Sequence, residues 1–481
     1  MAAAPPARGW IAANFTSLAS TGVVGLVITV LLSVYARRVL GPSAIGQVSW
    51  AVAAVAYLTV LVSPGLSVVG QRELARAPAQ TQRLLAPVLT LQSVLAAVVY
   101  GAVLAIAAFE PRGPVTSVLL AVQGVGLFLA AWNIVWVLQA HEHMVGPSLV
   151  ALALNALQIP AMVLLVHGPT DLVIYAALAL PFAFASAVYK FWYLARVGLV
   201  QPLRLRMTLE GIGWMLREAW PLALAQASVV VMANSGTLIL GFTYGDDAVG
   251  QFASAYRLML VPTVVTAALW NAYFPAFARS YDRPGEAVAL SREYLRLVAW
   301  IGFPIAAPGW SHGRHVVELL YGPEFAPCGH YFEWLCLTIG LTFLNYGFVA
   351  TLVPWGRSGL QLKITMSAAL LNLIVNAAAV PAYGAWGAVA ATLAAELLVV
   401  VLGVAIRRRL GLFWHPIWPV IGPSALCSAV VSVGFAVLPA TLDRVWWVQL
   451  GIGALVLAAC LMVFERRVLG VLWRPRDKQL R

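Results

Sequence analysis

Charged residues are scarce in this chain of 481 residues: they make up 10% of it, against about a quarter in ordinary soluble proteins. Hydrophobic residues make up 62%. The chain also lacks the alternation of apolar and polar positions that marks β-barrel strands. Its hydrophobic residues form long runs of about 18 to 24 instead, the length at which a helix crosses a bilayer. This composition excludes an ordinary soluble protein.

Other absences narrow the function. The four cysteines show no CxxC and no metal-ligand spacing, so we expect neither a metal site nor a redox motif. No Walker A string is present, and the short loops leave no room for a soluble catalytic or nucleotide-binding domain. We therefore expect a protein that is not an enzyme and has no cofactor. If the protein moves a substrate across the membrane, the energy must come from a H+ or Na+ gradient, the membrane potential or downhill flux of the substrate.

The long hydrophobic runs predict an all-α polytopic membrane protein of about fourteen transmembrane helices. The predicted segments are 14–35, 44–65, 84–108, 115–138, 147–167, 171–194, 218–241, 250–273, 292–312, 331–354, 363–380, 387–406, 416–438 and 446–464.

Two short strings indicate an internal duplication. AIGQ at 44–47 and AVGQ at 248–251 each open a hydrophobic segment, and six segments separate them. Parallel six-helix repeats are a common way to build a two-lobed carrier. The predicted parts are an N-lobe (1–195), a cytoplasmic amphipathic linker (196–217), a C-lobe (218–410), and two further helices with a basic tail (411–481).

Basic residues gather in alternate loops. With the N-terminus in the cytoplasm, most of the 30 lysines and arginines fall on the cytoplasmic side, as the positive-inside rule requires. Both termini are therefore predicted to be cytoplasmic. The net charge of +12 reflects topology and attraction to anionic membrane lipids, and we expect no nucleic-acid partner.

Several longer strings resemble one family. These are ARRVLGPSAIGQVSWA, LVSPGLSVVGQRELAR, GTLILGFTYGDDAVGQFASAYRL and LLNLIVNAAAVPAYGAWGAVAATLAAEL. They resemble the polysaccharide-type flippases of the multidrug/oligosaccharidyl-lipid/polysaccharide (MOP) exporter superfamily. The resemblance implies a flippase that moves a polyprenyl-pyrophosphate-linked oligosaccharide across the cytoplasmic membrane of a prokaryote, by alternating access of two lobes. Its implied partners are that lipid-linked oligosaccharide and the enzymes of polysaccharide assembly, a polymerase or glycosyltransferases.

The sequence departs from the resembling families at two places. Gly236-Thr237 stands where an aspartate often precedes the LILG string, which puts a role for that carboxylate in doubt here. The first segment holds no charge between Asn14 and Tyr35, unlike the lipid II flippase branch with its buried arginines.

Arg257 is the clearest candidate for binding substrate phosphate, because an ionisable group within a membrane segment is costly. A guanidinium supplies the charge and the donors that a pyrophosphate needs. Arg37 and Arg38 join it as candidates at the outer rim. The competing interpretation of Arg257 is snorkelling to outer headgroups.

Polar residues at helical spacing within the segments predict a cleft that could bind sugar hydroxyls, or else helix–helix contacts between small and polar residues. They are Asn14, Ser17, Thr21, Gln47, Gln226, Asn234, Asn372 and Asn376.

Glu396 lies near the middle of its predicted segment. It is the candidate for ion coupling, by taking up a proton or by ligating Na+, and the alternative is a structural glutamate, protonated or paired.

Two other functions stay open. A multidrug or organic-cation antiporter of the same superfamily would favour acidic cleft residues and usually has twelve spans. A membrane glycosyltransferase or polymerase would usually need a sizeable outside domain, which the short loops do not provide.

Overall fold

A computed structural model describes the backbone of residues 8–200, 207–411, 416–437 and 446–464, and the side chains of residues 24–200, 207–411, 416–435 and 446–462. Over the described residues the chain is helical, with no β-strand. The predicted all-α class is confirmed, and helices cover all fourteen predicted segments, some with interruptions. By length and composition, eleven of the described helices are able to span a membrane, and the apolar stretch Trp446–Met462 is shorter.

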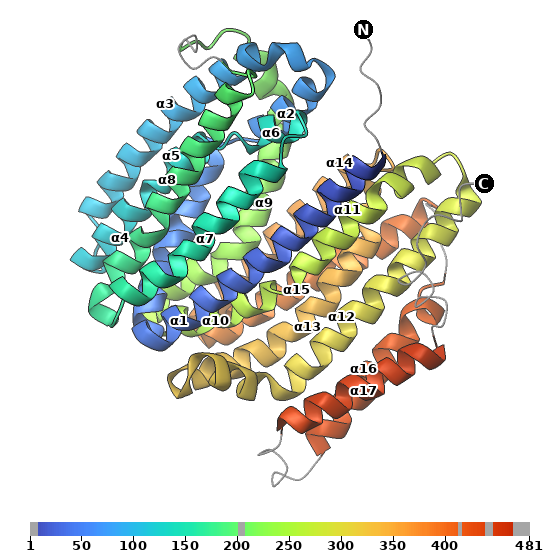
Figure 1. The fold of residues 1–481 in the computed structure, drawn as a ribbon. Coiled ribbons are helices and arrows are strands. Elements are labelled where there is room, and N and C mark those ends of the chain that lie inside the picture. Colours follow the sequence, from blue (N-terminus) through green and yellow to red (C-terminus); the bar gives the residue numbers. More distant parts are fainter. Residues whose placement is uncertain (1–7, 201–206, 412–415, 438–445, 465–481) are drawn as a thin grey trace. The chain divides into compact units, whose positions relative to one another are not determined.

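The chain forms two compact units, residues 1–250 and 251–481. The helices that begin in the first unit are α1 (Arg8–Val62), α2 (Leu66–Arg76), α3 (Thr81–Ala108), α4 (Pro114–Gly124), α5 (Gly126–Ala131), α6 (Val135–Ala140), α7 (Val145–Leu165), α8 (Leu172–Arg196), α9 (Ile212–Thr243) and α10 (Gly245–Leu260), the last of which runs into the second unit (Figure 1). The second unit continues with α11 (Thr263–Ser280), α12 (Pro284–Tyr321), α13 (Ala326–Phe348), α14 (Ser358–Tyr383), α15 (Ala385–Arg409), α16 (Trp418–Val437) and α17 (Trp446–Phe464). Short 3-10 turns lie at Pro78–Gln80, Pro169–Asp171, Pro323–Phe325 and Ala350–Leu352.

The first two predicted spans are joined by a kink instead of a loop. Gly41 adopts φ 75° and ψ 173° within α1, a conformation that is accessible to glycine and costly for other residues. Pro42 follows and removes a backbone donor. The helix therefore changes direction at Gly41, and the residues on both sides of the kink are helical.

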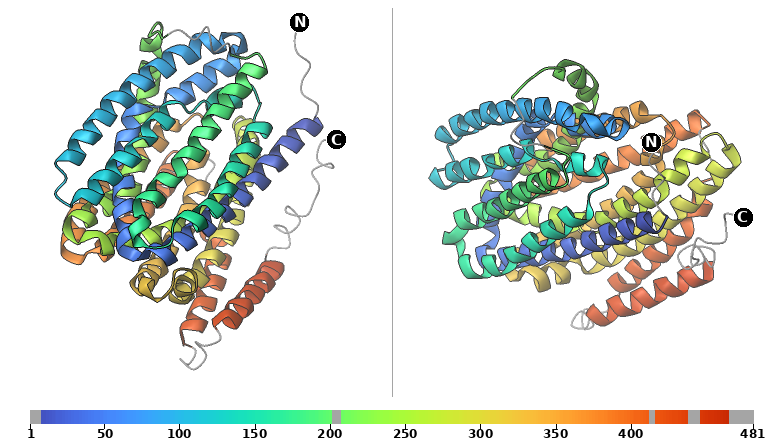
Figure 2. Two further views of the ribbon diagram at one scale, coloured as in Figure 1. Left: turned by 60° about the vertical axis from the view of Figure 1, so that its left-hand side comes forward. Right: turned by 45° about the horizontal axis from the view of Figure 1, so that its top comes forward.

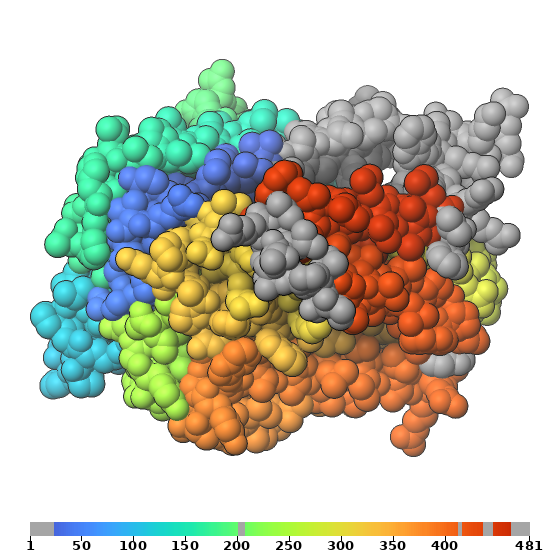
Figure 3. Space-filling model, turned by 90° about the horizontal axis from the view of Figure 1, so that it is seen from below, coloured from blue at the N-terminus to red at the C-terminus, as the bar shows by residue number. Residues whose placement is uncertain are grey.

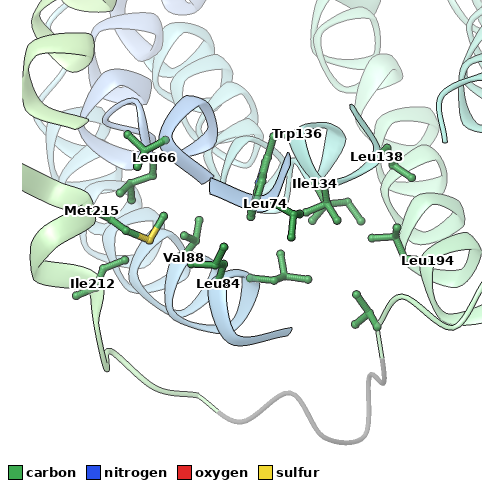
Figure 4. Close-up of a cluster of buried hydrophobic side chains, with 14 of the residues drawn as sticks. Leu66, Leu74, Leu84, Val88, Ile134, Trp136, Leu138, Leu194, Ile212 and Met215 are labelled. Carbon is green, nitrogen blue, oxygen red and sulfur yellow. The ribbon is translucent and has the colours of Figure 1, made fainter. Parts of the chain in front are cut away.

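A cluster of buried apolar side chains connects five helices of the first unit, α2, α3, α6, α8 and α9 (Figure 4). Leu74 of α2, Val88 of α3, Trp136 of α6 and Met215 of α9 are almost fully buried in it. A Cβ on Gly70 would lie 2.8 Å from the Trp136 ring, so only glycine allows α2 and α6 to pack this closely. Elsewhere in the unit α3, α4, α7 and α8 form a layer of neighbouring helices (Figure 2).

Helix α9 packs along α1. Trp50 makes an edge-to-face contact with Phe242, their ring centroids 5.4 Å apart. Toward the other end of this helix pair, a Cβ on Gly65 would lie 2.8 Å from Leu222. These contacts explain why α9 belongs to the first compact unit, although the sequence repeat places it at the start of the second lobe. The lobe boundaries stay a prediction, because spatial clustering and sequence duplication are different properties.

The second unit is built around α12 and α13, with α15 packed on α13 and α14 on α15. Helix α16 joins α12 through serines: Ser424 donates to the carbonyl of Ala299 at 2.9 Å and Ser432 to that of Ala307 at 3.1 Å. Pro304 and Pro308 lie within this part of α12 and remove backbone hydrogen bonds from the helix. In a membrane, neighbouring side chains can bond the carbonyl groups that are freed in this way. Figure 3 shows α16 and α17, in red, against the other helices of this unit.

Candidate functional site

Each copy of the repeated string lies in a helix that is interrupted further along the chain, at places that differ by about six residues between the two copies. The helix that follows AIGQ ends at Val62, and α2 begins at Leu66 after Gly65 with φ 74°. AVGQ lies in α10, which ends before Val261-Pro262, after which α11 begins. Interrupted helices in corresponding parts of two repeats point to substrate sites in carriers. We therefore expect substrate-binding residues around α10 and among the residues that face it within the second unit.

Arg257 lies in the last turn of α10, four residues before the interruption, and its side chain is exposed. Among the residues that the structure describes, no acidic side chain forms an ion pair with it. Its guanidinium is therefore accessible to an anion. Whether it binds phosphate stays a prediction.

Arg37 and Arg38 have different surroundings. Arg37 is buried and donates to the carbonyl of Ser33 at 3.2 Å, so its own helix holds part of the guanidinium. Arg38 is exposed. In this conformation Arg38 is the more accessible of these two predicted phosphate ligands.

Glu396 lies in the middle of α15, and its carboxylate faces Thr342 and Asn345 of α13, with Tyr256 of α10 nearby. One carboxylate oxygen, Oε2, is buried and has no hydrogen-bond partner among the described residues. Side chains of α10 and α13 that carry oxygen atoms therefore lie around a buried carboxylate of α15 in the second unit. Such a set suits a proton or a small hard cation. Thr342, Asn345 and Tyr256 were not predicted, because their proximity to Glu396 depends on helix packing.

Asn372 and Asn376 of α14 are both almost fully buried, and the Asn376 side chain donates to that of Asn372 at 3.0 Å. Thr392 of α15 is also buried. This burial agrees with the helix–helix alternative for the two asparagines.

The other predicted cleft residues are dispersed. Gln226 is exposed on α9, and Asn234 is partly buried and donates to the carbonyl of Val230 at 3.0 Å. Gln47 is partly buried. Its counterpart Gln251 is structural, donating to the Glu324 carbonyl at 2.8 Å and accepting from the Cys328 amide at 3.1 Å. The side chains of Asn14, Ser17 and Thr21 lie outside the described residues, as do parts of the predicted linker and basic tail.

Arg407 is a buried arginine in the last turn of α15 that the sequence did not single out as a candidate. It is 2% exposed, donates to the Gly347 carbonyl at 3.1 Å and to Ser291 at 2.7 Å, and lies over the Trp355 ring at 5.1 Å. A stripe of buried residues at three- or four-residue spacing along α15 leads to it (Ala388, Thr392, Ala395, Val399, Gly403). That stripe was the available signal that position 407 faces inward.

The membrane-length helices are those of a multi-pass membrane protein. Interrupted helices with polar groups nearby, such as those on α10, α13 and α15, are typical of membrane transport proteins. Solved structures of the MOP superfamily share this fold. The lipid II flippase MurJ in an inward closed conformation matches with a TM-score of 0.74 at 12% identity, covering 95% of this chain and 99% of that one. An inward-facing multidrug resistance transporter of the MATE family matches with a TM-score of 0.61 at 17% identity, covering 81% and 95%.

The sequence comparisons narrow this class. The model of the family described as "Polysaccharide biosynthesis protein" matches residues 11–281. The chain belongs to this family, which confirms the predicted resemblance to polysaccharide-type proteins. It is also 23% identical to a protein of Shigella dysenteriae named "Putative O-antigen transporter", over 76% of this chain and 92% of that one.

Proposed function

We propose that the protein is a flippase for a polyprenyl-pyrophosphate-linked oligosaccharide in the cytoplasmic membrane of a prokaryote. The observation that carries this proposal is Arg257, an accessible guanidinium within a membrane-length helical segment of a polysaccharide biosynthesis family member. A cation within a membrane segment is costly and therefore marks a candidate functional site. The Shigella relative and the flippase-like fold support the same substrate class.

In this proposal the substrate pyrophosphate binds Arg257, with Arg38 and Arg37 nearer the outer rim. The glycan crosses between the lobes while the lipid tail stays in the bilayer, and alternating access moves the opening from one side to the other. Both termini are cytoplasmic. Glu396, with Thr342 and Asn345, couples the movement to a H+ or Na+ gradient. A polymerase and glycosyltransferases are the expected partners, which supply or use the lipid-linked glycan.

The Arg257→Ala variant tests the role of the Arg257 guanidinium, in proteoliposomes with a headgroup-labelled lipid-linked oligosaccharide. A charge-assisted hydrogen bond is worth about 1.5–3 kcal/mol, so its loss should slow flipping by about 10- to 100-fold. Arg279→Ala is the matched control, since Arg279 is an exposed arginine in the last turn of the neighbouring helix α11. Flipping at the parental rate by well-folded Arg257→Ala protein would remove Arg257 from the site.

The organic-cation antiporter is the second candidate, and the buried carboxylate of Glu396 is the observation in its favour. Ion-driven export of organic cations by the same proteoliposomes, without movement of the lipid-linked glycan, would establish it instead.

A further inference from the structure

The two copies of the repeated string lie against each other in the first unit. A Cβ on Gly46 would lie far inside 3.0 Å of the Asp246 carbonyl oxygen, and one on Gly250 equally close to that of Pro42. Glycine at both positions lets the start of α10 pack directly on α1 just after its kink. The contact joins backbone to backbone, so side-chain rearrangement cannot relieve a larger residue there.

An ion pair between Arg112 and Asp246 lies beside this contact. Arg112 belongs to the α3–α4 loop, and Asp246 opens α10. Their side chains are 13% and 22% exposed, so the pair is screened less than a surface pair. The guanidinium also lies 4.3 Å from the centroid of the Trp50 ring on α1, an arrangement that favours a cation–π interaction. The pair therefore fastens the start of α10 to α1 and to the α3–α4 loop.

Two buried donors next to this pair have no acceptor among the described residues: Nη1 of Arg112 and Nε1 of Trp50. Both donors lie close to Gly241, at 3.2 Å and 2.7 Å from the position that a Cβ there would take. A buried donor without an acceptor costs free energy. Asp246 therefore satisfies only part of the donors at this place, and an anion with several oxygens matches the set better than one carboxylate does.

We propose that Arg112, Trp50 and Asp246 form an anion-responsive latch, in which a diphosphate takes the place of the Asp246 carboxylate on Arg112 and so releases the start of α10 from α1. The proposal rests on the proposed function for its ligand, the diphosphate of the lipid-linked substrate. On the predicted topology this latch lies at the outer face. Arrival of the substrate phosphates there would itself loosen the contact between the two repeated strings.

Hydrogen–deuterium exchange of the full-length protein tests the latch, with inorganic pyrophosphate as the probe and sulfate at equal ionic strength as the anion control. Pyrophosphate should speed amide exchange in the first two turns of α10 by about fivefold, the effect expected for loss of a modest ion pair. Asp246→Asn should show the faster exchange without pyrophosphate, whereas Asp247→Asn, its exposed neighbour, should match the parent. Arg112→Gln should not respond to pyrophosphate.

Two outcomes overturn the latch: unchanged exchange in Asp246→Asn, or an undiminished pyrophosphate response in Arg112→Gln. Failure of the proposed function is a separate result. If proteoliposomes do not flip a lipid-linked oligosaccharide but pyrophosphate still loosens α10 through Arg112, the latch stands and its assigned substrate is wrong. If flipping occurs while amide exchange in α10 changes neither with pyrophosphate nor in Asp246→Asn, the latch is wrong and the proposed function stands.

Discussion

Replacing Gly250 with alanine should destabilise the first unit, because its added Cβ would overlap the Pro42 carbonyl oxygen. To reach an ordinary contact distance, α10 and α1 must separate by about 1 Å or more, and overpacking of this kind costs about 1–3 kcal/mol. We take the upper end of this range because the obstacle is backbone. Alanine regains about 1 kcal/mol through its higher helix propensity. The net loss is about 2 kcal/mol, which corresponds to a fall in Tm of about 4–8 °C for a unit of this size.

Thermal unfolding in one detergent, followed by intrinsic fluorescence, measures this effect. Gly101→Ala is the matched control, since Gly101 lies within α3 and a Cβ there would meet nothing within 4 Å. Its Tm should stay level or rise. A Gly250→Ala protein with the parental Tm and the parental amide exchange in α10 would refute the close contact between the two repeated strings.

Three further predictions concern single side chains. Arg407→Met leaves the acceptors of two hydrogen bonds buried and should cost about 1–3 kcal/mol, whereas Arg408→Met, on the exposed side of α15, should stay within about 0.5 kcal/mol of the parent by Tm. Glu396→Gln should reduce gradient-driven transport to the rate measured without a H+ or Na+ gradient, and a variant that keeps its gradient dependence would remove Glu396 from coupling. Burial, with a smaller contribution from His143, lowers the pKa of His141 below its usual range, so the folded state favours the neutral ring and stability should fall as pH drops below about 6.5. His141→Gln should show a smaller loss of Tm between pH 7 and pH 5, and an equal loss would count against this assignment.

Run length and composition were sufficient to predict the helices. A membrane-spanning helix satisfies its backbone within the segment, so the local pattern determines where it forms. The connections were harder to predict: the region around Gly41 was expected to be a loop and is a kink, because glycine and proline together can bend a helix as well as end it.

The candidate site was predicted only in part. Glu396 stands out in an apolar segment, but its neighbours Thr342 and Asn345 are some fifty residues away in sequence and meet it only through packing of α13 on α15. Arg407 and Arg112 show the same limitation. In the sequence, an arginine at the end of a membrane segment looks like a charge that sets topology. Whether its side chain faces solvent, lipid or a neighbouring helix depends on the tertiary structure.

Flipping of a headgroup-labelled polyprenyl-pyrophosphate oligosaccharide in proteoliposomes is the most direct test of the central claim. We predict that the purified protein exposes the labelled headgroup to a membrane-impermeant reagent on the opposite side, and that Arg257→Ala slows this by about 10- to 100-fold while Arg279→Ala does not. Folded protein that leaves the headgroup on its original side, under either a H+ or a Na+ gradient, would contradict it.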